Sequence, residues 1–269
     1  MQWRRSHQQI NSIEFWTVCV VLGVFFCGNG VQAEELRTTP YRPTLSNPAQ
    51  LPIPGYLEVE MGWQSLKDKA TDDHRHSVPY LVKFAFTDRV GLLVGGEAVV
   101  VNDREIGSSV AGFGDLTPLL KLNFPLPSET ASAFGLEVGA KLPTAPSTIG
   151  SQHTNYIATG IYSLSRGPLG VDLNLGYTRL GDAPSGTGKD RVFWAASAGY
   201  AITPRWGMGG EFAGTARQSV KPFAQFLAFT NYVVAPRVVA DTGRAFGLNG
   251  ASQEWTAFAG LTILVGKVF

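Results

Sequence analysis

The chain has 269 residues, and its 31 glycines, 16 phenylalanines, 8 tyrosines and 6 tryptophans make it rich in turn-forming and aromatic residues. This composition favours an all-β protein. Because the formal net charge is only +1, electrostatics give no reason to expect nucleic acid as a partner.

Residues 1–33 have the features of a cleaved signal peptide. Arginines at positions 4 and 5 precede an apolar run over residues 15–26, and Val31-Gln32-Ala33 supplies small residues for signal peptidase. A membrane anchor is the alternative, but the run is shorter than the roughly 20 apolar residues that a spanning helix needs. We therefore expect cleavage after residue 33.

Both cysteines, Cys19 and Cys27, lie in this leader, so the mature chain is expected to contain no thiol and no disulfide. The leader also contains Arg4, Arg5 and Glu14. Without them, the 22 basic and 21 acidic residues of the whole chain become 20 of each. The mature chain is therefore neutral.

Residues 34–55 are predicted to form a Pro-rich periplasmic arm. Its five prolines remove backbone donors and restrict φ, which excludes a helix or an inner strand. From residue 56 to residue 269 the dominant pattern is alternation of apolar and polar residues, as in 134–142, 169–177 and 57–63. This pattern predicts strands with one apolar face.

Short connections of turn-forming composition alternate with longer polar ones along the chain. That layout is typical of a membrane barrel, with tight turns at the periplasmic end and long loops outside. We predict a transmembrane antiparallel up-and-down β-barrel of about twelve strands. The expected strands are 56–66, 78–87, 90–101, 112–124, 133–143, 154–164, 168–181, 191–202, 205–214, 222–233, 237–247 and 254–269.

Aromatic residues of the apolar parity collect at both ends of the predicted strands. Such belts match the two interfaces of a bilayer, whereas a soluble β-sandwich, the alternative, would expose this band to water. The belt expected at the long-loop ends contains Trp63, Tyr80, Tyr156, Tyr177, Trp194 and Trp255. The belt expected at the short-turn ends contains Phe86, Phe124, Phe134, Tyr162, Tyr200, Trp206 and Tyr232.

The last predicted strand ends on Phe269, which resembles the C-terminal signal read by the barrel-assembly machinery. Together with Gly112-Phe113-Gly114-Asp115, the segment 236–249 and the closing strand from Gly260, it gives the chain a likeness to a known family. The chain resembles the outer-membrane transporters associated with the meta-pathway of phenol degradation. The resemblance implies a small barrel in the bacterial outer membrane that passes small molecules, with aromatic or hydrophobic compounds among the candidates, and no catalytic residues.

Charged residues of the polar parity are expected to face the lumen, because a charge facing lipid is costly. Either they line a pore for a small-molecule solute, or they form an ion-pair network that fills the lumen of a structural or adhesive barrel. Inward glycines favour the pore, because they leave space. The lumen-lining candidates are Glu58, Glu60, Lys83, Glu97, Asp115, Lys121, Glu137, Lys141, Asp172, Arg191, Glu211, Arg237 and Asp241.

Other motifs are weaker indications of chemistry. His74 and His76 form a His-x-His pair in the first predicted long loop, but a zinc site needs three or four positioned ligands, so we predict no metal and no cofactor. A barrel hydrolase that uses His153 is the least favoured alternative, because no serine has a nucleophile context. Gly112-Phe113-Gly114 is interpreted as a backbone kink within a strand. We predict a non-enzymatic channel or transporter in the bacterial outer membrane, embedded in the lipid bilayer.

Overall fold

The structure, a computed structural model, describes residues 36–104, 107–127 and 131–269. The predicted signal peptide, residues 1–33, lies outside the described residues, as do the first two residues of the predicted arm. Within the described ranges, no helix is long and apolar enough to cross a membrane.

Alternating sequence patterns become long strands throughout the described part of the chain after residue 55. Their bounds are β1 Tyr56–Lys67, β2 His74–Ala85, β3 Val90–Asp103, β4 Val110–Gly112, β5 Thr117–Pro125, β6 Ala131–Lys141, β7 Asn155–Arg166, β8 Leu169–Arg179, β9 Asp190–Ala201, β10 Trp206–Arg217, β11 Val220–Ala235, β12 Val238–Gly247 and β13 Trp255–Lys267.

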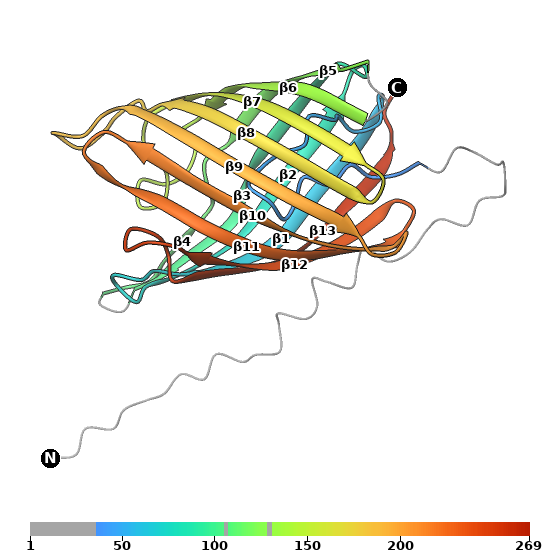
Figure 1. The fold of residues 1–269 in the computed structure, drawn as a ribbon. Coiled ribbons are helices and arrows are strands. Elements are labelled where there is room, and N and C mark those ends of the chain that lie inside the picture. The colour runs from blue at the N-terminus through green and yellow to red at the C-terminus, as the bar shows by residue number, and fades with distance from the viewer. Residues whose placement is uncertain (1–35, 105–106, 128–130) are drawn as a thin grey trace, which may run out of the picture. The chain divides into compact units, whose positions relative to one another are not determined.

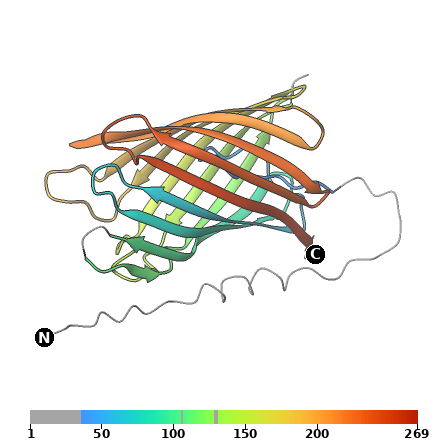
Figure 2. The ribbon, with the colours of Figure 1, turned by 90° about the horizontal axis from the view of Figure 1, so that it is seen from below.

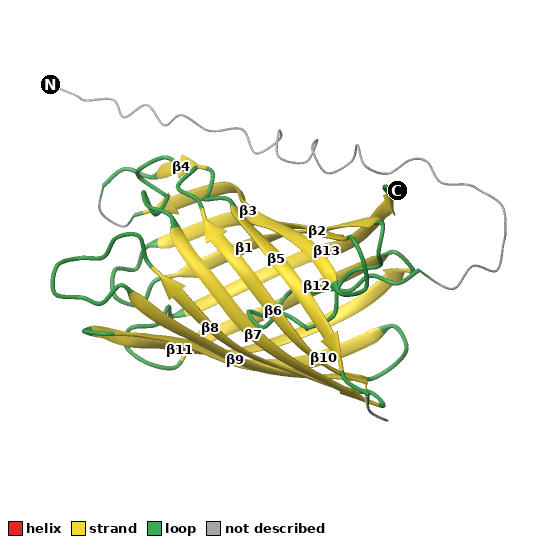
Figure 3. Ribbon diagram, turned by 90° about the horizontal axis from the view of Figure 1, so that it is seen from above, coloured by secondary structure: helices red, strands yellow, loops and turns green. Residues whose placement is uncertain are grey.

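The strands form one antiparallel ring that is closed on itself. Consecutive long strands pair with each other, and β1 pairs with β13 as well as with β2, so the sheet has no free edge (Figure 1; Figure 2). The short β4 continues the line of β5, since both pair with β3. Counted this way, the ring has twelve strand positions, and the predicted antiparallel barrel is confirmed (Figure 3).

The predicted strand at 112–124 is interrupted rather than continuous. β4 ends at Gly112 and β5 begins at Thr117, and between them the Gly114 amide donates to the Glu97 carbonyl oxygen at 2.9 Å. A Cβ at Gly114 would collide with the Glu97 side chain, so only glycine permits this approach. The interpretation of Gly112-Phe113-Gly114 as a backbone kink agrees with this interruption.

The second strand begins at His74, four residues before the predicted start, so the His-x-His pair belongs to β2 and not to a loop. The His74 ring packs edge-on against Trp255 at 6.1 Å and stacks on His76 at 6.2 Å, and His76 stacks on Trp63 at 6.4 Å. These ring contacts extend the strand because they offset the polar character of the segment.

The outer surface of the barrel is an apolar band bounded by aromatic side chains. Met61, Leu173, Leu175 and Phe212 are exposed in its middle. Exposed members of the predicted belts are Trp63, Tyr156, Tyr177 and Trp194 at the long-loop ends, and Phe86, Phe124, Phe134, Tyr200, Trp206 and Tyr232 at the short-turn ends. This outer surface fits contact with lipid rather than with water.

Candidate functional site in the barrel lumen

Residues 36–55 form an irregular arm that runs through the interior of the barrel, visible as the blue segment inside the ring of strands in Figure 1. The prolines account for its lack of regular structure. Its position differs from the periplasmic one expected from the sequence. The arm lies inside the barrel because inward carboxylates accept hydrogen bonds from its backbone amides, which have no partners within the arm itself.

Two glutamates of β1 hold the first part of the arm. The Thr39 amide donates to Glu58 Oε2 at 2.9 Å. The Tyr41 amide donates to Glu60 Oε1 at 2.7 Å, and the Arg42 amide donates to Glu60 Oε2 at 3.1 Å. Because these donors are backbone groups, the contacts depend on the path of the chain more than on the arm's side-chain identity.

The middle of the arm is held from the opposite wall of the barrel. Glu211 on β10 accepts the Leu45 amide at 2.9 Å, the Ser46 amide at 2.7 Å and the Ser46 hydroxyl at 2.6 Å. Asn47 Nδ2 donates to both oxygens of Glu137 on β6, at 3.1 Å each. The arm therefore bridges strands on different sides of the lumen.

Tyr41 lies at the centre of this network and is 2% exposed. Its ring is flanked by two ammonium groups, with Lys83 Nζ 4.0 Å and Lys121 Nζ 4.1 Å from the ring centroid. The same lysines donate to arm carbonyl oxygens, Lys83 to Thr39 and Lys121 to Pro48, at 2.5 Å each. The aromatic face and the carbonyl dipoles thus stabilise both buried cations.

The buried charges are also paired within the barrel wall. Lys83 stands directly across from Glu58 in the sheet, and its Nζ lies 2.5 Å from Glu58 Oε1 and 2.6 Å from Glu60 Oε1. Lys121 stands across from Glu137, with Nζ 2.9 Å from Oε1. Buried charges are tolerated when they are paired and hydrogen-bonded, so the wall and the arm together satisfy this cluster.

Arg42 reaches the far side of the lumen, where its Nε and Nη2 donate to the Asp241 carboxylate at 3.2 and 3.3 Å. Its guanidinium lies so close to Gly62 and Gly260 that a Cβ at either position would collide with it. These two inward glycines therefore leave room for the arm and not for solute. At these positions the expectation that inward glycines indicate an open pore is wrong.

The sequence-predicted lumen residues divide into those that contact the arm and those that do not. Asp172 is linked to the arm through Ser163, whose hydroxyl donates to Asp172 and accepts the Ala49 amide. The candidates in direct contact with the arm are Glu58, Glu60, Lys83, Lys121, Glu137, Glu211 and Asp241.

The remaining candidates lie apart from the arm. Glu97 forms a bidentate pair with Arg75 at 2.6 and 2.7 Å, and Lys141 Nζ lies 3.5 Å from Asp115. Arg191 lies at the long-loop end of β9. Arg237 is exposed in the tight turn between β11 and β12, so its expected place on the inward face is wrong; the predicted strand began one residue too early.

Sequence reasoning missed the arm residues that complete the site, chiefly Tyr41, Arg42, Ser46 and Asn47. The sequence did contain an indication that the arm makes contacts. It combines Tyr41 with several hydrogen-bonding side chains in a segment whose prolines already exclude a strand. Their targets, however, lie up to 199 residues away in sequence. No local pattern identifies such partners.

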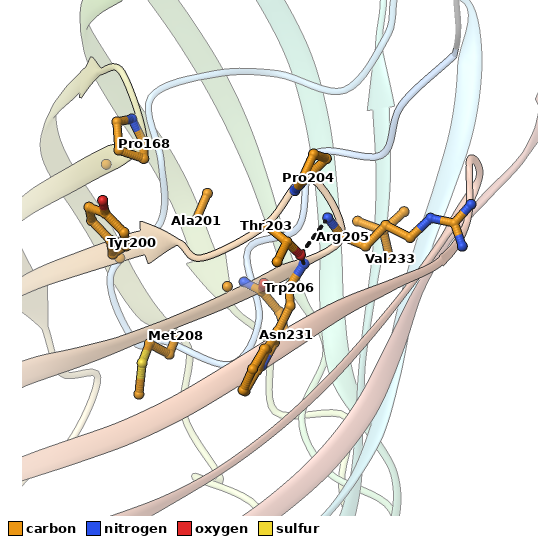
Figure 4. A pocket seen from close by; sticks show the side chains of 13 residues that line it. Pro168, Tyr200, Ala201, Thr203, Pro204, Arg205, Trp206, Met208, Asn231 and Val233 are labelled. Carbon is orange, nitrogen blue, oxygen red and sulfur yellow. Dashed lines mark hydrogen bonds between the residues drawn. The ribbon is translucent and has the colours of Figure 1, made fainter.

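The arm does not fill the whole lumen. At the short-turn ends of β8 to β11, an open hollow of about 220 Å³ is lined by the inward glycines Gly170, Gly199 and Gly207 together with the outward residues Tyr200, Trp206 and Met208. Figure 4 shows the tight turn that borders it, in which the Arg205 amide donates to Thr203 Oγ1 at 3.3 Å. A cavity of about 150 Å³ lies between Tyr41 and β2. Space remains beside the arm.

Phenylalanines line part of the inner wall, although the inner face is otherwise polar. Phe229 stands opposite both Gly209 and Gly243, and Phe258 stands opposite Gly243. Both rings are half-buried and lie against these glycines, which have no side chain to displace them. An apolar surface is thereby presented to the lumen.

At the opposite rim, Asp115 fastens the connection between β6 and β7. Its carboxylate accepts the Ala145 amide at 3.1 Å and the Ser151 amide at 2.7 Å. Desolvation acts to raise the pKa of Asp115, but these two amides and the nearby Lys141 outweigh it and hold the pKa below its usual value. The folded loop therefore favours the ionised carboxylate.

Acidification is expected to release this loop. Because the pKa of Asp115 is lowered by folding, its stabilisation is complete above the unfolded pKa of about 4 and is lost as the pH falls through the folded value. Hydrogen exchange of residues 144–153, corrected for intrinsic rates, should lose protection only below about pH 4. Asp115→Asn should show reduced protection at every pH. A wild-type loop equally protected at pH 3 and pH 7 would contradict the role of this carboxylate.

The closed ring, the lipid-compatible outer band and the polar interior define the fold as a transmembrane β-barrel. No family model and no curated protein matches the chain. Among solved structures, the chain is similar to an outer-membrane channel from Pseudomonas putida F1, with a TM-score of 0.62 and 15% identity, over 80% of this chain and 97% of that one. It is also similar to the NanC porin, with a TM-score of 0.53 and 11% identity, over 77% of this chain and 98% of that one. At these identities the likeness shows the fold.

Proposed function

We propose that the protein is a channel of the bacterial outer membrane that passes small molecules through a lumen narrowed by its own arm. The observation that carries the proposal is the incomplete filling of a closed barrel: a cavity of about 150 Å³ remains between the arm residues Tyr41 and Arg42 and the wall at Glu60 and β2. A purely structural barrel has no need of such space.

Phe229 and Phe258 support a preference for apolar or aromatic solutes. Their rings face the lumen beside glycines and offer flat surfaces for stacking, whereas the buried charges on the other side are engaged by the arm. This agrees with the resemblance to transporters associated with the meta-pathway of phenol degradation, a membership that we include in the proposal. The similar proteins described as a channel and a porin support the transport class.

Insertion through the barrel-assembly machinery forms part of the same proposal. The C-terminal Phe269 is 64% exposed, and the Val268 amide donates to the Gly55 carbonyl oxygen at 2.7 Å, close to where the arm joins β1. The terminal ring packs edge-on against Phe84 at 5.4 Å. The last strand therefore ends beside the first one, with its aromatic residue accessible at the short-turn rim.

Solute flux tests the function directly. The mature chain, recovered from the outer-membrane fraction and reconstituted in liposomes, should cause swelling with small solutes and faster swelling with aromatic than with sugar solutes of equal size. Heat-modifiable gel mobility checks that the barrel is folded. The competing function is a structural or adhesive barrel, favoured by the extent of the buried network. Absence of flux for every solute, both with and without the arm, would establish that alternative.

A further inference from the structure

Two arginines face each other at the long-loop end of the lumen. Arg191 of β9 pairs directly with Arg217 of β10, and on its other side with Thr178 of β8. Its neighbour Val192 points outward and is 42% exposed, so the alternation of the strand directs Arg191 inward. Directly paired residues share a face of the sheet, so Arg217 points inward as well.

These guanidiniums have no counter-charge among the described residues. No ion pair or hydrogen bond engages either side chain there, and Arg191 Nε is buried without a hydrogen-bond partner. Like charges directly opposite each other repel, and a buried donor without an acceptor is destabilising. The fully buried Lys83 and Lys121, by contrast, are both paired with glutamates. An anion between the two arginines would relieve both defects.

Phenylalanines lie one step deeper on the same face. Thr215 of β10 stands between Phe193 of β9 and Phe223 of β11, each directly paired with it. Both rings are half-buried, and Phe193 lies against Gly176. The step of two residues from the arginines to these rings is about 7 Å along the strand. That distance is comparable to the length of one aromatic ring that carries a carboxylate.

The rim around these residues is held in place by backbone contacts. The Gly188 amide, in the connection between β8 and β9, donates to the Gln218 carbonyl oxygen at 3.1 Å, next to Arg217. A Cβ at Gly188 would collide with the Gln218 side chain. The hairpin that carries Arg217 is thus fastened to the neighbouring connection, and the arginine pair is positioned before any ligand arrives.

We propose that Arg191 and Arg217 form an anion-binding subsite at the outer mouth of the lumen, which takes the carboxylate of a small aromatic acid while Phe193 and Phe223 contact its ring. Planar guanidiniums match a carboxylate in bidentate geometry. The subsite rests on the proposed channel function and gives it a substrate class, since a solute captured at the mouth enters beside the arm.

Ligand binding to the purified, folded barrel tests the subsite independently of transport. Benzoate should bind measurably by calorimetry, and benzyl alcohol, its neutral counterpart, and inorganic phosphate should both bind more weakly. Arg191→Gln and Arg217→Gln should each weaken benzoate binding about tenfold or more, because a charged hydrogen bond is lost. Phe193→Leu should weaken benzoate binding and leave acetate binding unchanged.

The matched control is Arg179→Gln, on the neighbouring strand β8 at the same rim. Arg179 points outward and pairs with Asp190 at 2.8 Å, so its loss should leave benzoate binding unchanged. Unchanged benzoate affinity in both Arg191→Gln and Arg217→Gln would overturn the subsite, as would equal affinities for benzoate and benzyl alcohol in the wild type. Binding that follows these predictions in a protein without solute flux would refute the channel and leave the subsite standing.

Discussion

Deletion of residues 36–50 is expected to raise the single-channel conductance several-fold while the barrel stays folded. The arm crosses the lumen from β1 to β10, and its removal leaves water in its place. The two buried lysines that it covers keep partners in the wall, since Lys83 remains paired with Glu58 and Lys121 with Glu137. Glu211 and Asp241 lose their partners in the arm but become hydrated, which costs little.

Planar-bilayer recordings of the deletion variant and of the wild type measure this effect. The deletion retains Gly55, whose amide donates to the Ala85 carbonyl oxygen at 2.9 Å and holds the start of β1. Heat-modifiable mobility should therefore be preserved. A folded deletion variant with wild-type conductance would show that the arm does not restrict the path.

Substitutions at Tyr41 provide a milder test of the same restriction. Tyr41→Ala removes the ring between Lys83 and Lys121 and should increase the frequency of open events. Tyr41→Phe is the matched control, since it keeps the ring and loses only the hydroxyl bond to the Gln50 carbonyl oxygen at 2.6 Å. Its conductance should stay close to that of the wild type.

The largest loss of stability is expected for Glu137→Gln. Glu137 is 3% exposed and balances the charge of Lys121, which is fully buried. Its replacement keeps an amide oxygen that can accept from Lys121 but removes the counter-charge, so the ammonium is left with neutral partners such as the Pro48 carbonyl oxygen and the Tyr41 ring. Loss of one member of a buried ion pair costs about 3 to 5 kcal/mol, because the other charge stays desolvated.

Chemical unfolding in lipid, followed by tryptophan fluorescence, measures this cost. Glu97→Gln is the control, because Glu97 and its partner Arg75 are partly exposed and such pairs contribute about 1 kcal/mol or less. The double variant Lys121→Met/Glu137→Gln should recover part of the loss, since it removes the stranded charge. If Glu137→Gln changed ion preference with no loss of stability, the carboxylate would be a hydrated pore residue and not a member of the buried network.

The barrel was predictable from the sequence because each strand alternates apolar and polar residues, a pattern that is visible locally and that the membrane requires. Residues 134–142 alternate between apolar and small or charged residues, and all but the last of them lie in β6, with Phe134 exposed and Glu137 buried. A strand between lipid and a polar lumen must alternate in this way, and its turns must be polar. Fold class, strand number and the aromatic belts therefore follow from the sequence alone.

The ends of individual strands were less predictable, because contacts between residues distant in sequence can extend or shorten a strand. The polar sequence at the start of β2 predicts a loop. In the structure, the His74 ring packs against Trp255, which lies 181 positions later in the chain, and the strand begins there. Arg237 has the parity of an inward residue but falls in a turn. Such errors arise because alternation determines a face only once the strand ends are known.

The arm and the arginine pair were decided only by the tertiary structure. Prolines indicate an irregular segment, but its path depends on carboxylates from β1, β6, β10 and β12 that converge only after the ring closes. Likewise, Arg191 and Arg217 lie 26 positions apart in sequence, and their pairing depends on the register of β9 with β10. Alternation along a strand determines which side chains face the lumen, whereas closure of the barrel determines which of them meet there.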